Sequence, residues 1–142
     1  MPRPATLPGT PDAGEERVVC HVDMDCFYAA CERMREPALR DEPVVVGMGF
    51  EPGETGGAVA TASYEARDYG VESAQAISEA LERLPRKVDA AADPDLDVDD
   101  AGFYRPVDMD YYQSIGAAVK DLLHERADVL RSVSIDEAYL DV

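Results

Sequence analysis

Two short acidic clusters are the residues of this sequence best suited to chemistry. The first is Asp23-Met24-Asp25, after an apolar run, and the second is Asp136-Glu137, between two apolar runs. Carboxylates at strand ends lie at the rim of a sheet, where clusters far apart in sequence can converge. Converging carboxylates with an open face suit Mg²⁺, which prefers oxygen ligands, and a pair of such ions can promote phosphoryl transfer. The spacing fits solvated strand ends as well, so it leaves both interpretations open.

A strand is predicted before the first cluster, and strands are predicted on both sides of the second. Runs of β-branched and apolar residues predict strands over 17–23, 43–48 and 57–63. Two further strands, over 129–135 and 138–142, are expected to be joined by a tight turn at Asp136–Glu137. The fold class is therefore α/β (α+β).

Helical spacing predicts the elements that pack on these strands. The helix over 27–35 is expected to place Phe27, Ala30, Cys31 and Met34 on one face, and Pro37 follows its end. Short helices are expected around 64–69 and over 78–84. The longest helix is predicted over 108–126, with Asp108 as its N-cap.

Two segments lie outside the predicted strands and helices. Residues 1–16 are rich in Pro, Gly and charge and are expected to be a flexible tail. Residues 86–102 are rich in Asp, Ala and Pro, and their DPDLDVDD run invites comparison with a calcium loop. That loop would need Gly at its sixth position and Glu at its twelfth, where the sequence has Val98 and Tyr104. A solvated acidic insertion is the interpretation that remains.

Composition restricts the function classes. Thirty acidic residues oppose thirteen basic ones, a net charge of −17, which indicates a halophilic protein kept solvated in strong salt. Such a charge argues against an extensive nucleic-acid surface within these residues, because phosphate contacts require Lys or Arg. No apolar run approaches the roughly 20 residues of a membrane span, and the N-terminus lacks a signal sequence, so a cytoplasmic protein is expected. The cysteines Cys20, Cys26 and Cys31 are predicted to be small buried hydrophobes.

Four sequence blocks resemble one family. HVDMDCFYAACE, MREPALRDEPVVVG, GAVATASYEARDYGVESA and SIDEAYLDV follow one another in the order and approximate spacing of a Y-family DNA polymerase. The resemblance is closest to the DNA polymerase IV (DinB) branch and covers about residues 17–142, apart from the acidic insertion. It implies a ferredoxin-like palm, incomplete here, formed by residues 17–26 and 103–142. A small fingers subdomain, residues 27–102, would be inserted between these parts.

The resemblance also implies an activity. Members are error-tolerant translesion polymerases of DNA repair that transfer nucleotides from dNTPs to a primer 3′-end, using two Mg²⁺ ions. Asp23 and Asp136 match the aspartates that bridge both ions, Glu137 the carboxylate that completes the site, and Met24 a main-chain carbonyl ligand. The implied partners are primer-template DNA, dNTP and, through regions beyond residue 142, a sliding clamp. The full-length protein is expected to be a monomer.

Nucleotide contacts are implied at the start of the first helix and after the third strand. Tyr28 matches the steric gate that excludes a ribose 2′-hydroxyl. The main-chain amides of Phe27 and Tyr28 match triphosphate contacts. The β- and γ-phosphates would be held by Thr61, Tyr64 and Arg67, since guanidinium and hydroxyl donors suit phosphate oxygens. Ala58 and Ala60 match the small residues that roof the nascent base pair.

Some residues near these blocks have no catalytic role in the expected site, and two alternative functions remain open. Asp25 is expected to be an N-cap or hydrogen-bond acceptor, His21 and His124 to be structural, and Glu65 to have no defined role. Gln75 stands where the family often has Met. The family continues beyond residue 142 with a lysine-bearing palm strand, a thumb and a little finger. The alternatives are a nucleotidyl cyclase-like palm, which would not need the steric gate, and an inactive folded fragment or acidic interaction module.

Overall fold

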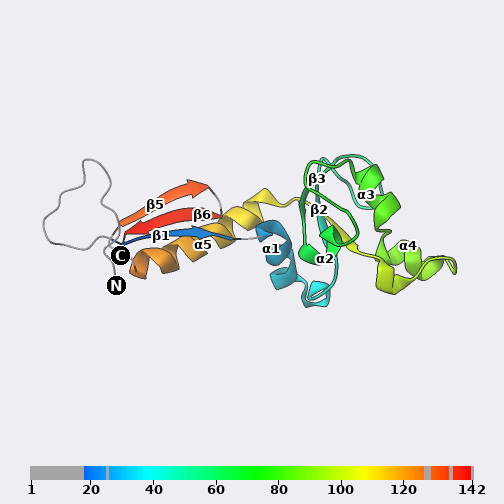
Figure 1. Ribbon diagram of the computed structural model, residues 1–142, viewed down its shortest axis with the longest axis horizontal. Coiled ribbons are helices and arrows are strands. Elements are labelled where there is room, and N and C mark those ends of the chain that lie inside the picture. Colours follow the sequence, from blue (N-terminus) through cyan, green and yellow to red (C-terminus); the bar gives the residue numbers. More distant parts are fainter. Residues whose placement is uncertain (1–17, 25, 127–128, 135, 142) are drawn as a thin grey trace, which may run out of the picture. The chain divides into compact units, whose positions relative to one another are not determined.

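The computed structural model describes residues 18–24, 26–126, 129–134 and 136–141, which form a mixed α/β chain (Figure 1). The strands are β1 (Val19–Asp23), β2 (Val44–Met48), β3 (Ala58–Ala62), β4 (Phe103–Pro106), β5 (Val129–Ser134) and β6 (Glu137–Asp141). The helices are α1 (Phe27–Arg35), η1 (Pro37–Leu39), α2 (Tyr64–Arg67), α3 (Ile77–Arg83), α4 (Lys87–Ala92), η2 (Val98–Asp100) and α5 (Met109–Arg126). The chain divides into two compact units, and the first combines residues 1–23 with 116–142 while the second spans 24–115.

The first unit is built on an antiparallel sheet in the order β1-β6-β5. β6 lies between the two others, so segments more than one hundred residues apart in sequence are hydrogen-bonded neighbours (Figure 1). The register pairs Val19 with Asp141 at one end of β1 and Asp23 with Glu137 at the other. Lys120 of α5 donates to the main-chain oxygen of Ser134, which ties the second half of this helix to the end of β5.

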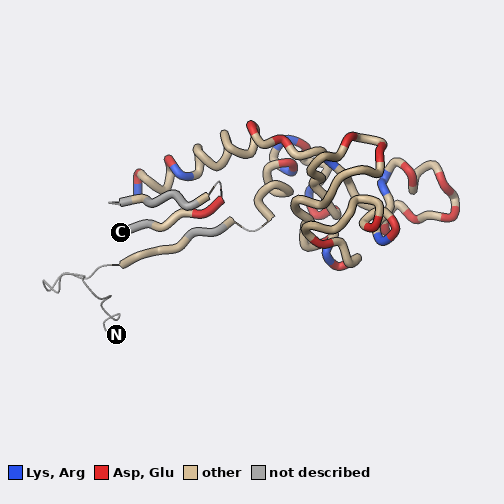
Figure 2. The backbone as a smooth tube through the Cα atoms, turned by 90° about the horizontal axis from the view of Figure 1, so that it is seen from above, with Lys and Arg blue, Asp and Glu red and all other residues tan. Residues whose placement is uncertain are grey.

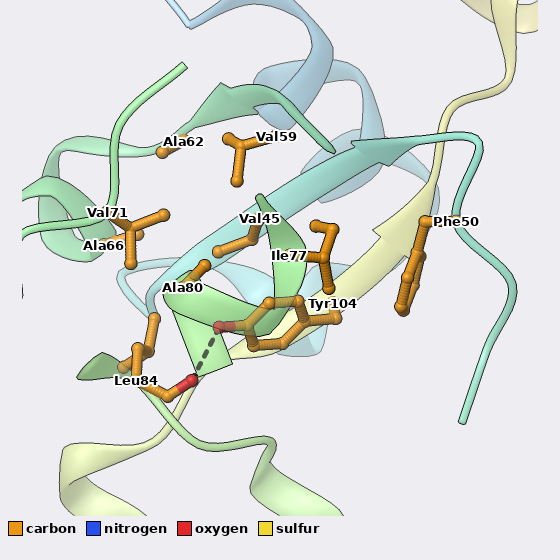
Figure 3. Packing of buried hydrophobic residues seen from close by; sticks show 10 residues of the cluster. All are labelled: Val45, Phe50, Val59, Ala62, Ala66, Val71, Ile77, Ala80, Leu84 and Tyr104. Atoms are coloured by element: carbon orange, nitrogen blue, oxygen red, sulfur yellow. Dashed lines mark hydrogen bonds between the residues drawn. The ribbon is translucent and has the colours of Figure 1, made fainter. Parts of the chain in front are cut away.

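The second unit is built on a sheet in the order β3-β2-β4, in which β2 is antiparallel to β3 and parallel to β4. The first three residues of β2 are fully buried, as expected of a central strand covered on both faces. Figure 3 shows the apolar cluster around this strand, which consists of Val45, Phe50, Val59, Ala62, Ala66, Val71, Ile77, Ala80, Leu84 and Tyr104. The Tyr104 hydroxyl donates to the main-chain oxygen of Leu84 at 2.6 Å, so its polar end is satisfied inside the core.

β4 is an element for which the sequence predicts nothing. Its four residues, FYRP, carry no clear alternation, and it forms because the main chain pairs in parallel with β2, from Val44–Phe103 to Gly47–Pro106. Tyr104 then points into the core while Arg105 remains half-buried. The pairing joins the chain before and after the acidic insertion into one sheet.

Residues 91–100 of the acidic insertion are exposed, whereas Ala90 and Ala101 near its two ends are buried, and the insertion contains regular structure. α4 and the short η2 lie within it, and a parallel bridge joins Arg86 to Gly102 where the insertion leaves and rejoins the unit. Figure 2 shows acidic positions along the loop between α4 and η2. Lys87 anchors the base, with Nζ at 3.0 Å from a carboxylate oxygen of Glu42 and a second bond to the main-chain oxygen of Val98.

The predicted long helix is confirmed as α5, and Asp108 caps it. The main-chain N–H of Tyr111 donates to Asp108 Oδ1 at 3.2 Å, as an N-cap side chain does. Tyr112 on this helix is fully buried, whereas Leu122 is 63% exposed. No helix in the described part of the chain is long and apolar enough to cross a membrane.

Two predictions about α1 and the cysteines are wrong. Of the four residues expected on one face of α1, Phe27 and Cys31 are buried, but Ala30 and Met34 are exposed. The charged Glu32 is buried at 1% instead. Of the cysteines, only Cys31 is buried; Cys26 is half-buried and Cys20 is exposed. Helical spacing does not reveal that a buried carboxylate here has an arginine and a tyrosine hydroxyl as partners.

Candidate active site

The two acidic clusters meet at one end of the first unit's sheet. Asp23 is the last residue of β1 and lies directly opposite Glu137, the first residue of β6, in the antiparallel register. Residues paired in this way have Cα atoms roughly 4.5–5.5 Å apart. Asp136 occupies the turn immediately before Glu137. The backbone thus brings three acidic residues from both clusters together, although the side chain of Asp23 and all of Asp25 lie outside the described part of the structure.

Each described carboxylate of this group has its own hydrogen-bond donor. The Ser134 hydroxyl donates to Asp136 Oδ1 at 3.1 Å. His21 Nε2 lies 2.8 Å from Glu137 Oε1. The side chain of Glu137 is 28% exposed, so it borders solvent while its orientation is constrained.

His21, which the sequence predicts to be structural, contacts one of the predicted site residues, Glu137. Its ring stacks on Tyr139, with centroids 4.6 Å apart and planes inclined by 19°. No motif surrounds His21 in the sequence, and its partner lies 116 residues away. Nothing in the VCHVD run of β1 singles out His21.

The donor set fits a hard divalent cation. Carboxylate oxygens are the ligands that Mg²⁺ prefers, and it commonly takes only one or two of them while retaining water or phosphate. Among the side chains that the structure describes, no group of three or more His, Cys, Asp or Glu is arranged to hold a metal. The Asp23 side chain, which would complete such a group, is not among them. Two carboxylates and a strand-paired third acidic residue remain a consistent partial site.

In the second unit, the start of α1 presents main-chain amides. Cys26 precedes the helix in the left-handed conformation, with φ 48° and ψ 43°, which is uncommon for a residue other than glycine. The first N–H groups of a helix, here those of Phe27 and Tyr28, have no acceptor within the helix. Because the helix dipole adds partial positive charge there, these groups suit an anion such as phosphate.

The ring of Tyr28 is held by α5. It stacks on Tyr112 with centroids 4.6 Å apart and planes inclined by 15°, and its hydroxyl lies 3.9 Å from Met109 Sδ. Tyr112 is fully buried and Tyr28 is half-buried. The aromatic side chain of Tyr28 thus has a firm support on one side.

A β-bulge determines which residues of β3 face outward. Val46 pairs with Thr61 and the next residue of β2, Gly47, pairs with Val59, so Ala60 is an extra residue in β3. Strict alternation would place Thr61 on the same side as the buried Val59. With the bulge, Ala58, Ala60 and Thr61 are all half-buried while Val59 and Ala62 are buried. Bulges commonly redirect side chains near active sites.

Donors from two elements meet at the end of β3. The main-chain oxygen of Ala62 accepts from Arg67 Nε at 2.9 Å and from Cys26 Sγ at 3.4 Å. The guanidinium carbon of Arg67 lies 5.0 Å from the ring centroid of the exposed Tyr64. α2 itself is capped by Ser63, whose hydroxyl accepts from the Ala66 N–H. The second unit therefore brings the start of α1 beside the residues of β3 and α2 that the sequence nominates for phosphate binding.

Glu65, for which the sequence predicts no role, pairs with α1. Its carboxylate lies 3.0 Å from the Arg33 guanidinium. Burial alone would raise the pKa of Glu65, but its main-chain amide and Arg33 outweigh burial and lower it. Arg33 also donates to the main-chain oxygens of Leu39 and Glu42, so Glu65 is one end of a bond set that fixes α2 against α1.

Comparison with known proteins agrees with this arrangement. The profile of the impB/mucB/samB family matches residues 22–142. A protein of Halobacterium salinarum named DNA polymerase IV is 69% identical over 142 residues, which are all of this chain and 33% of that protein. A solved Y-family DNA polymerase chimera of Dbh and Dpo4 is 34% identical, with a TM-score of 0.73 over 89% of this chain and 32% of that one. An insertion ternary complex of Dbh DNA polymerase gives a TM-score of 0.71 at 35% identity, over 89% and 32% of the two chains.

The chain belongs to the impB/mucB/samB family, which confirms its resemblance to the Y-family polymerases. It spans about a third of the length of the relatives that it matches.

Proposed function

We propose that these residues are the catalytic N-terminal part of a low-fidelity translesion DNA polymerase. The observation that carries this proposal is the β1–β6 register, which pairs Asp23 with Glu137 beside Asp136. Solvated strand ends would need no such convergence between clusters more than one hundred residues apart. The relatives named DNA polymerase IV and the Dbh ternary complex support DNA and dNTP as partners.

Asp23, Asp136 and Glu137 would hold two Mg²⁺ ions, with the main-chain carbonyl of Met24 as a further ligand. Bound there, the ions would lower the cost of deprotonating a primer 3′-hydroxyl and stabilise the leaving pyrophosphate. The protein's own contribution is to keep the carboxylates oriented. The hydrogen bonds from Ser134 and His21 support this part of the proposal.

The triphosphate would be held in the second unit. Its oxygens would accept from the main-chain amides of Phe27 and Tyr28 and from the side chains of Thr61, Tyr64 and Arg67. Nε of Arg67 is already bonded to Ala62, so a phosphate would bind through the terminal guanidinium nitrogens. Phosphoryl transfer depends mainly on positioning and charge stabilisation, which these donors would supply.

Substrate selection would reside in Tyr28 and in the two alanines of β3. The support of Tyr28 by Tyr112 suits a steric gate, because a gate must not yield when a 2′-hydroxyl approaches. Ala58 and Ala60 are half-buried and small, so a base pair above them would be loosely enclosed. Loose enclosure would tolerate damaged templates and discriminate weakly between correct and incorrect pairs. In this assignment residues 17–26 and 103–142 would form the palm and residues 27–102 the fingers.

We also propose that the protein works in strong salt and binds a sliding clamp. The net charge of −17 supports function in strong salt, because dissolved ions screen the repulsion between the acidic side chains. The clamp contact would lie in regions beyond residue 142, together with the surfaces that grip duplex DNA.

The test is primer extension by a full-length polymerase in which residues 1–142 of this chain are joined to the remainder of the Halobacterium salinarum relative. Asp136→Asn and Glu137→Gln should each lower the rate with Mg²⁺ at least about 100-fold, as loss of a group that stabilises the transition state does. Both changes keep side-chain size, so folding should be preserved, which circular dichroism checks.

Asp121→Asn is the matched control. Asp121 is an exposed acidic residue of α5 in the same unit, and its substitution changes the net charge equally. Its rate should equal that of the parent. Full activity of Asp136→Asn would overturn the proposed function.

A further inference from the structure

His21, Tyr139 and Glu137 form a linked set on two strands. His21 and Tyr139 lie directly opposite each other in the β1–β6 register, and Glu137 lies two residues before Tyr139 on β6. Glu137 is thus the diagonal neighbour of His21, a position within reach of long side chains on one face of an antiparallel pair. The contact distances agree, with 4.6 Å between the two ring centroids and 2.8 Å between His21 Nε2 and Glu137 Oε1.

This contact contributes little to stability. The side chains of His21 and Glu137 are 43% and 28% exposed, and exposed ionic or polar pairs are weak because water competes for both groups. The ring of Tyr139 is also 39% exposed. The contacts instead fix the orientation of the Glu137 carboxylate. The imidazole of His21 cannot rotate freely because it stacks on Tyr139, and its hydrogen bond holds one oxygen of Glu137 in place.

We propose that His21, supported by Tyr139, is a positioning residue that orients the Glu137 carboxylate for a divalent cation. The inference rests on the proposed function, in which Glu137 is a cation ligand. The imidazole can donate this bond either as the neutral Nε2–H tautomer or as the imidazolium. One oxygen of Glu137 is engaged in the bond, which limits the rotation that would otherwise oppose cation binding. Hydrogen-bond partners of metal ligands typically contribute 10- to 100-fold in metal affinity.

The experiment measures binding of Mn²⁺ alone to the 142-residue chain by electron paramagnetic resonance. His21→Phe keeps a ring to stack on Tyr139 but has no donor, and it should weaken Mn²⁺ binding about 10-fold. Tyr139→Leu removes the ring support and should weaken binding in the same direction. His21→Gln restores a donor and should recover most of the loss.

His124→Phe is the matched control, since it makes the same substitution at an exposed histidine of α5. It should leave Mn²⁺ affinity unchanged. The thermal midpoint of His21→Phe should also equal that of the parent, which separates a positioning role from a structural one.

Two outcomes would overturn the inference in different ways. Parental affinity in His21→Phe, with binding still lost in Asp136→Asn, refutes the role of His21 and leaves the proposed function intact. Binding by the parent that does not depend on Asp136 refutes the cation site itself, and the role of His21 with it.

Discussion

Removing the buried carboxylate of Glu32 should destabilise the second unit markedly. Glu32 on α1 is 1% exposed, and its two oxygens accept from Arg35 at 2.8 and 2.6 Å. The hydroxyl of Tyr112 on α5 donates to the same carboxylate at 2.7 Å. Arg35 also donates to Asp108 at 2.8 Å and covers the ring of Tyr111. The first turns of α5 are therefore bound to α1 through one acidic side chain.

The loss of stability expected in Glu32→Ala depends on which group the substitution leaves without a hydrogen-bond partner. Arg35 is 39% exposed and keeps Asp108, so it can return to solvent at little cost. The Tyr112 hydroxyl cannot, because the residue is fully buried, and a stranded buried hydroxyl costs about 1–3 kcal/mol. The one methylene group that is removed, Cγ, adds about 0.8 kcal/mol. A loss of about 3 kcal/mol in the free energy of unfolding is therefore expected. This is the lower end of the roughly 3–5 kcal/mol lost when one partner of a buried ion pair is removed.

Urea unfolding followed by circular dichroism, at fixed KCl, measures this loss. Tyr112→Phe should cost about 1.5–3 kcal/mol in the parent, as for a hydrogen bond to a charged group. In the Glu32→Ala background the same change should instead recover stability, by up to about 1–3 kcal/mol, because it removes the hydroxyl that has lost its partner. Glu79→Ala, which breaks an exposed pair with Arg83, is the control and should cost no more than about 0.5 kcal/mol. Additive effects of Glu32→Ala and Tyr112→Phe would refute the reasoning.

Three further outcomes are expected. Arg105 donates to both oxygens of Glu36 and, through these bonds, lowers the pKa of that carboxyl. The pair therefore stabilises the fold above the ordinary carboxyl pKa, and this contribution is lost as the pH falls through the lowered one. Between about pH 6 and about pH 3, the thermal midpoint should therefore fall less in Arg105→Gln than in the parent. An equal fall in both proteins would contradict this. In the full-length polymerase, Tyr28→Ala should sharply raise ribonucleotide incorporation while largely sparing dNTPs, and an unchanged preference in single-nucleotide kinetics would reject the gate. The 142-residue chain alone should not extend a primer from low to multimolar KCl. At low KCl its net charge of −17 repels DNA, and at multimolar KCl screening removes this repulsion but adds no phosphate contacts; templated extension abolished by Asp136→Ala would count against this.

Local pattern was sufficient for most of the elements. Period-two and period-3.6 spacing predicts the positions of nine of the described helices and strands, from β1 and α1 to β5 and β6, to within one or two residues. The Asp108 cap was also predictable, because capping depends on residues three positions apart. These features follow from interactions between near neighbours in the chain.

Features that depend on distant partners were not predictable. β4 exists because β2 offers it a parallel edge, and the outward position of Thr61 depends on a bulge that only the β2–β3 register defines. Burial of Glu32 depends on a hydroxyl 80 residues away. In each case the deciding free energy belongs to a contact between elements, which one-dimensional periodicity does not contain.

The candidate site shows the same division. The sequence by itself determined which residue types are present, with acidic residues after β1 and before β6, an aromatic at the start of α1, and an arginine in α2. Only the tertiary structure decided that Asp23 faces Glu137 across two strands and that His21 reaches the Glu137 carboxylate. Strand register sets these pairings, because a slip of one residue would turn every side chain of β1 to the opposite face of the sheet.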